Sequence, residues 1–176
     1  MLNRQVLLLC EHASNTLPIW ANGYFPPDAR KLLNSHRAWD KGVASLGKGL
    51  AQEIHCPLIL GKHSRLLLDL NRSLDSKALW SEWSREMSEK LKQKAIREFY
   101  LSYRKEAREC LRHHLSKGPT LVLALHSFTP TWKGKDRPTD LGILFRPETS
   151  RERQMADWMR LQLGLRLPNW KIHFNL

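Results

Sequence analysis

Two apolar runs of this chain lead into a histidine. Residues 6–10 (Val-Leu-Leu-Leu-Cys) are followed by His12, and residues 121–125 (Leu-Val-Leu-Ala-Leu) are followed by His126. A short apolar run is typical of a buried strand, and open α/β sheets hold their ligands at the carboxyl ends of strands. One such histidine alone more often caps a turn or fills a polar gap. Two of them predict a metal site, because histidine is the commonest metal-binding side chain.

A third apolar run, Leu66 to Leu68, leads into Asp69, Asn71 and Arg72. We expect a buried strand over residues 65–70, with its polar residues at the same edge of the sheet. Arginine offers a planar fork that binds a carboxylate through two hydrogen bonds, and the neighbouring amide adds a hydrogen bond without charge. Arg72 and Asn71 are therefore predicted to form an anion clamp. The alternative is a structural Arg72 that pairs with Asp69.

The third metal ligand has two candidates, Glu11 and Asp40. Zinc in catalytic sites usually keeps three protein ligands and an open position for water. Side chains of sequence neighbours diverge on an extended chain, so Glu11 points away from His12, and we favour Asp40. The alternative for Asp40 is an ordinary carboxylate at a helix start, stabilised by the helix dipole. Ser127 carries a hydroxyl that could orient substrate, but no G-x-S-x-G motif surrounds it.

The motifs resemble those of the N-formylglutamate amidohydrolase family, which is similar to zinc carboxypeptidases and aspartoacylases. The resemblance covers roughly residues 4–175 and depends on four segments in the expected order: Cys10–Asn15, His36–Gly42, Ser64–Arg72 and Leu125–Pro130. It implies hydrolysis of the formamide of N-formyl-L-glutamate, or of a related N-acyl amino acid, with one Zn²⁺ as cofactor. It also implies a three-layer α/β sandwich with a mostly parallel central sheet, as in the zinc-carboxypeptidase-like (phosphorylase/hydrolase-like) fold.

The resemblance also assigns roles to residues. Asn71 and Arg72 would bind the substrate carboxylate, and Arg137 would help to bind a dicarboxylate. Carboxypeptidase-like enzymes carry a glutamate ligand three residues after the first histidine, but this chain has Asn15 there. Family members also continue beyond a segment like residues 171–176 into a part that supplies the glutamate base.

Two outcomes follow from that difference. Glu11 takes over as the catalytic base, or the chain is a weak or inactive relative that keeps the metal and the anion clamp. We expect a single domain over residues 1–176 that lacks its C-terminal part. Such an end would expose the apolar side chains of Trp170, Ile172 and Phe174 and so allow self-association.

Composition limits the other classes of function. The formal charge of +12 would suit a nucleic-acid protein, but between Glu82 and Glu109 the basic residues alternate with acidic ones, as on a solvated helix face. No nucleic-acid-binding motif accompanies the basic residues, so nucleic acid is not the expected partner. No apolar run approaches the roughly 18 residues of a membrane span. Three widely spaced cysteines fit a reducing cytoplasm rather than a disulfide framework.

Strands that alternate with helices along the chain predict a largely parallel sheet. The expected strands are 6–10, 58–60, 65–70, 121–125, 141–145 and 170–174, and the expected helices are 28–33, 39–55, 84–115 and 150–163.

Overall fold

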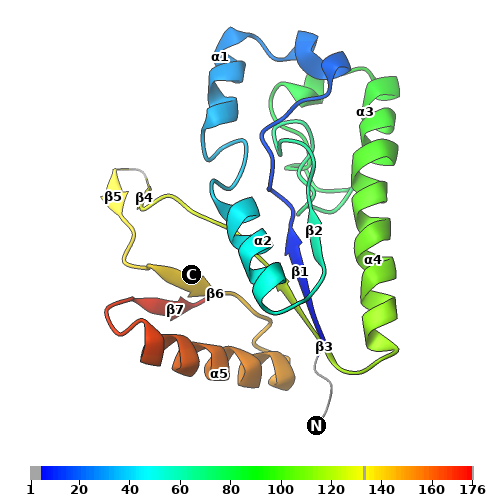
Figure 1. The fold of residues 1–176 in the computed structure, drawn as a ribbon. Helices are drawn as coiled ribbons and strands as arrows, with labels where there is room; N and C mark the ends of the chain where they lie inside the picture. The colour runs from blue at the N-terminus through cyan, green and yellow to red at the C-terminus, as the bar shows by residue number, and fades with distance from the viewer. Residues whose placement is uncertain (1–4, 133, 176) are drawn as a thin grey trace. The chain divides into compact units, whose positions relative to one another are not determined.

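The computed structural model describes residues 5–132 and 134–175, and its fold is mixed α/β with a mostly parallel central sheet (Figure 1). The predicted fold class is therefore confirmed. The chain divides into two compact units, Met1–Phe128 and Thr129–Leu176. Within the described residues, no helix is both long and apolar enough to cross a membrane.

The sheet of the first unit has three parallel strands in the order β2-β1-β3. These are β1 (Gln5–Cys10), β2 (Leu58–Leu60) and β3 (Thr120–Ala124), all close to the predicted bounds. β1 lies in the centre, with Leu8 opposite Leu58 on one side and Leu123 on the other. Parallel neighbours end at the same edge of a sheet, so the residues that follow β1 and β3 start out side by side.

The two faces of this sheet are covered by different helices. Successive side chains of a strand point to opposite faces, and Leu7 packs in the main core while Cys10 packs with Val43. Val43 opens α2 (Val43–Glu53), and the main core includes residues of α3 (Glu89–Ala95) and α4 (Ser102–Leu115). α2 and α4 both contact β1 and β2, so the first unit has three layers.

The strand predicted over residues 65–70 is wrong. All of these residues are described, and they form turns and irregular backbone without a strand. Ser64 sets this conformation, because its carbonyl accepts the N–H of Leu67 at 3.0 Å and its hydroxyl accepts the N–H of Leu66 at 3.1 Å. The apolar run is still buried, with Leu67 0% exposed. Here the apolar run indicates that the segment is buried, but not that it pairs as a β-strand.

The predicted helices are present with shifted ends. The long helical region predicted from residue 84 begins with a 3₁₀ turn at Ser84–Glu86, and the regular helix starts at Glu89. A π-helical segment, Ile96–Leu101, joins α3 to α4. α1 covers Pro27–Lys31 and continues as a 3₁₀ turn at Leu32–Asn34.

One glycine lets two parts of the site approach each other closely. Gly61 follows β2, and its N–H donates to the carbonyl of Cys10 at 2.8 Å. A Cβ at this position would lie 1.9 Å from the backbone oxygen of Glu11. No other residue type fits there without moving the backbone, so Gly61 holds the chain against the residue that precedes His12.

The second unit has its own small core. β6 (Leu141–Ile143) pairs in parallel with β7 (Ile172–Phe174), and α5 (Ser150–Arg166) connects them. Ile143, Ala156 and Ile172 are its buried centre. Ahead of β6, this unit contains a short antiparallel pair, β4 (Thr131–Trp132) and β5 (Lys135–Asp136).

Candidate metal centre

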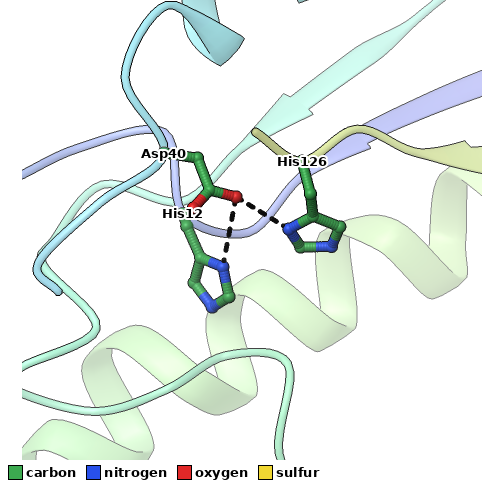
Figure 2. Close-up of side chains that lie close together, drawn as sticks. All are labelled: His12, Asp40 and His126. Carbon is green, nitrogen blue, oxygen red and sulfur yellow. Dashed lines mark hydrogen bonds and ion pairs between the residues drawn. The ribbon is translucent and has the colours of Figure 1, made fainter. Parts of the chain in front are cut away.

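Three side chains from distant parts of the sequence meet beyond the carboxyl ends of β1 and β3. One ligand atom from each of His12, Asp40 and His126 lies within 4.8 Å of the others. Figure 2 shows both imidazole rings directed at one oxygen of the carboxylate, with Asp40 Oδ2 2.8 Å from His126 Nδ1 and 3.6 Å from His12 Nδ1. The group has the His₂Asp composition predicted from the sequence, and imidazole and carboxylate are both zinc ligands.

The backbone explains why these side chains meet. His12 and His126 each lie two residues beyond their strand, and the N–H of Leu125 still donates to the carbonyl of Leu9 at 2.8 Å. Asp40 is joined to the first strand's end, because its N–H donates to the carbonyl of His12 at 2.9 Å. The ladder and this single hydrogen bond therefore hold all three residues at one edge of the sheet.

Asp40 does not act as an ordinary helix-start carboxylate. α2 begins at Val43 with Gly42 as its N-cap, so Asp40 lies ahead of the helix rather than in it. Its side chain is 3% exposed, accepts a hydrogen bond from Arg65 through Oδ1 and contacts His126 through Oδ2. The buried carboxylate is therefore neutralised by an arginine while one oxygen remains turned towards the histidines.

The two nitrogens of His12 have different surroundings. Nε2 lies 2.7 Å from Oδ1 of Asp69, a hydrogen bond in which the ring donates to the carboxylate. Nδ1 is buried and has no hydrogen-bond partner among the described residues. A buried nitrogen without a partner costs free energy unless a ligand satisfies it. A metal held by Nδ1 would do so, and a carboxylate behind the ligating histidine is the usual arrangement in metal sites.

The pKa values of Asp69 and His126 are both lowered, but for different reasons. Burial raises the pKa of Asp69, but the hydrogen bond and charge of His12, the N–H of Asn71 and the charge of Arg65 together hold it below its ordinary value. Burial and the neighbouring His12 lower the pKa of His126, against the charges of Glu11 and Asp69. His126 is therefore biased towards the neutral imidazole, the form that binds a metal.

Glu11 lies beside the group instead of diverging from it. Its side chain is 7% exposed, and Oε2 is 3.8 Å from Nε2 of His126. This oxygen and the hydroxyl of Tyr103, on α4, are both buried without a hydrogen-bond partner among the described residues. Burial and the charge of Glu11 raise the pKa of Tyr103, so the phenol keeps its proton. Glu11 is thus a buried carboxylate next to the metal-binding group, with His126 and Tyr103 as its polar neighbours.

The predicted anion clamp is connected to the metal-binding group through Asp69. Asp69 Oδ1 accepts the N–H of Asn71 at 2.9 Å, and Oδ2 lies 3.7 Å from Nε of Arg72. The Arg72 side chain is nevertheless 56% exposed, so its guanidinium remains accessible to a ligand. Tyr100 fixes the backbone here, because its hydroxyl donates to the carbonyl of Arg72 at 2.8 Å. Arg72 therefore pairs with Asp69 while its guanidinium stays exposed.

Ser127 and Arg137 are the two other residues predicted to contact the substrate. Ser127 is exposed and directly follows His126. Arg137 belongs to the second unit, where its N–H donates to the carbonyl of Pro130 at 2.7 Å. The substrate contacts of Ser127 and Arg137 stay predictions.

Sequence reasoning gave no role to three residues that the structure places in this network: Arg65, Asp69 and Tyr103. Asp69 entered only as an alternative partner for Arg72, and Tyr103 only as one residue of the helix expected over residues 84–115. A signal existed for Arg65 and Asp69, since both lie in the same motif as Asn71 and Arg72. Tyr103 left no such signal, because its spacing is that of a core residue.

Comparison with known proteins identifies the family. The N-formylglutamate amidohydrolase family model matches residues 4–175. The chain belongs to this family. The solved structure of gene product Atu2144 from Agrobacterium tumefaciens has a similar fold, with a TM-score of 0.83 and 26% sequence identity over 99% of this chain and 69% of that one. A search of curated proteins finds no match. The family assignment agrees with the resemblance carried by the four sequence motifs.

Proposed function

We propose that this member of the N-formylglutamate amidohydrolase family is a zinc-dependent hydrolase of N-formyl-L-glutamate or a closely related N-acyl amino acid. The observation that carries the proposal is the convergence of His12, Asp40 and His126, with the buried Nδ1 of His12 left without a partner. Family membership supplies the reaction class, and the ligand set supplies the chemistry. A bound Zn²⁺ would polarise the formyl carbonyl and lower the pKa of water to roughly 7.

The chain's own residues bind and orient the substrate. The guanidinium of Arg72 would hold a substrate carboxylate with help from the amide of Asn71, because charge-assisted hydrogen bonds to a planar fork are strong and directional. Ser127 and Arg137 are candidates for further polar contacts. Arg65 keeps the charge of Asp40 compensated, so that the carboxylate remains in place.

Glu11 is the proposed general base. Its carboxylate would take a proton from the attacking water as the water oxygen joins the formyl carbon, and would then deliver that proton to the leaving nitrogen. The C–N bond then breaks, and formate and the free amino acid leave. The proton of the Tyr103 hydroxyl lies near the same carboxylate and would limit its rotation.

Release of formate tests the proposal directly. Metal-depleted protein should gain turnover of N-formyl-L-glutamate when one equivalent of Zn²⁺ is added, and Glu11→Gln should bind zinc but lose about 10²–10⁴-fold in kcat. Zinc binding without turnover in the wild type would contradict hydrolysis and indicate a relative that only binds. No zinc binding at all would contradict the metal centre.

A further inference from the structure

The side chain of Asp69 touches both the anion clamp and a candidate metal ligand. Oδ1 lies 2.7 Å from Nε2 of His12 and 2.9 Å from the N–H of Asn71, and Oδ2 lies 3.7 Å from Nε of Arg72. The His12 and Asp69 side chains are 4% and 13% exposed, so water screens their contact only weakly, whereas the more exposed Arg72 leaves its contact with Asp69 open to water and to a competing anion. A single carboxylate thus divides its charge between an imidazole and a guanidinium.

The backbone keeps this carboxylate in place. The N–H of Asp69 donates to the carbonyl of Leu79 at 2.9 Å, and its carbonyl accepts the N–H of Arg72 at 3.1 Å. Arg104, on α4, donates to the carbonyl of Leu70 at 3.0 Å. The main chain is fixed on both sides of Asp69. A change in the partners of Arg72 therefore changes how far the carboxylate charge is neutralised, while the carboxylate stays in place.

We propose that Asp69 is a positioning residue that couples binding of a carboxylate at Arg72 to binding of the metal at His12. This proposal rests on the proposed function, because it needs both the metal and the anionic ligand. When a ligand carboxylate shares the guanidinium of Arg72, Asp69 is less neutralised and its hydrogen bond to His12 strengthens. His12 becomes a better donor at Nδ1, as expected for a histidine with a carboxylate behind it.

The coupling works equally in both directions. If a bound carboxylate raises the affinity for zinc by some factor, zinc raises the affinity for the carboxylate by the same factor. The site would then hold both ligands together more readily than either alone. An empty clamp leaves the charge of Asp69 shared with Arg72 and the metal held less tightly.

Zinc titration with and without glutarate tests this coupling. Glutarate is a dicarboxylate without a scissile amide, and neutral glutaramide is its control. Glutarate should raise the zinc affinity of the wild type at least about 5-fold. Asp69→Asn keeps the shape and the acceptor oxygen but removes the charge, so zinc affinity should fall by about 10–100-fold and the effect of glutarate should drop below about 2-fold.

Asp75→Asn is the matched control, because Asp75 is an exposed carboxylate six residues away on the same segment. It should leave both zinc affinity and coupling at wild-type values. Coupling that survives in Asp69→Asn would overturn the proposal and indicate direct attraction between glutarate and the metal. Failure of the wild type to bind zinc would overturn the proposed function as well, whereas zinc binding without coupling would overturn only the role of Asp69.

The tautomer of His12 gives a second readout that needs no variant. In metal-free protein, ¹⁵N NMR should show neutral His12 with its proton on Nε2, since Asp69 accepts it there. A proton on Nδ1 would contradict the arrangement by which Asp69 prepares His12 for the metal.

Discussion

His12 and His126 follow neighbouring strands of a parallel ladder, whereas Arg65, Asp69 and Arg72 lie on a segment that has no ladder at all. In the sequence both regions look alike, as an apolar run followed by polar residues. The strand-end region is fixed by backbone hydrogen bonds of β1 with β3. The Ser64–Arg72 segment is fixed by scattered hydrogen bonds of both backbone and side chains, such as Arg65 N–H to the carbonyl of Ala38 and the hydroxyl of Ser64 to the same carbonyl, both at 3.0 Å.

The two regions of the first unit are therefore held in place in different ways. A ladder ties each residue to its neighbour through repeated bonds, so the histidines are placed with little dependence on side chains. The Ser64–Arg72 segment depends on individual hydrogen bonds, and those made by side chains can each be removed by one substitution. Substitutions in the two regions should therefore differ in the size and kind of their effects.

Loss of a strand-end histidine should have the largest effect. His126→Gln removes a metal ligand but leaves the ladder intact, so kcat/KM for N-formyl-L-glutamate should fall on the order of 10³-fold or more while the far-UV circular dichroism spectrum stays unchanged. His113→Gln, on the exposed side of α4, is the control and should retain activity. Wild-type activity in His126→Gln would show that His126 is not a metal ligand.

Loss of the clamp should have a smaller and more selective effect. Arg72→Ala should raise KM about 10–100-fold for a carboxylate substrate, because hydrogen bonds to charged groups contribute about 1.5–3 kcal/mol. The corresponding uncharged amide substrate should be affected much less. Steady-state kinetics on both substrates decide the matter, and equal losses would show that Arg72 is only the structural partner of Asp69.

Removal of the hydroxyl that shapes the segment should affect stability. Ser64 is 0% exposed, and Ser64→Ala leaves the N–H of Leu66 without its acceptor, at a cost of about 1–3 kcal/mol in urea unfolding. Ser116→Ala removes a comparable hydroxyl at an exposed position, where the cost should stay below about 0.5 kcal/mol. Similar losses in both variants would mean that the segment does not depend on Ser64.

The smallest effect concerns pH. Burial lowers the pKa of His63, which precedes this segment and contacts the ring of Phe99 at 4.1 Å between centroids. As the pH falls, His63 therefore becomes protonated in the unfolded chain before it does so in the folded protein. The contribution of neutral His63 to the free energy of unfolding is complete above about pH 6.5 and is lost below it. His63→Gln should show a smaller drop in melting temperature between pH 7.5 and 5.5 than wild type. An equal drop in both proteins would contradict the burial of His63.

Sequence reasoning works best for the strand-end region. The runs before His12 and His126 predict strands, and parallel strands bring their carboxyl ends together, so the meeting of these two histidines follows from the pattern. Asp40 required a choice between two carboxylates, which the sequence decided only by side-chain direction. Its hydrogen bond to the backbone of His12 joins residues far apart in the chain and has no local signature.

The Ser64–Arg72 segment shows why the contact between Asp69 and His12 was not predicted. Apolar side chains report that a segment is buried, but the partner of each backbone group depends on residues elsewhere, here Ala38 and Leu79. Asp69 faces His12 only because the backbone turns between Ser64 and Leu67. A strand, as predicted, would have sent alternate side chains to opposite faces, and the contact between Asp69 and the histidine could not have been inferred from it.

The most direct test of the metal centre is X-ray absorption at the zinc edge of protein loaded with one equivalent of Zn²⁺. The account predicts a first shell of nitrogen and oxygen at about 2.0–2.2 Å, with scattering from two imidazole rings that falls to one ring in His126→Gln. A shell without imidazole, or one that His126→Gln leaves unchanged, would contradict the His12–Asp40–His126 centre.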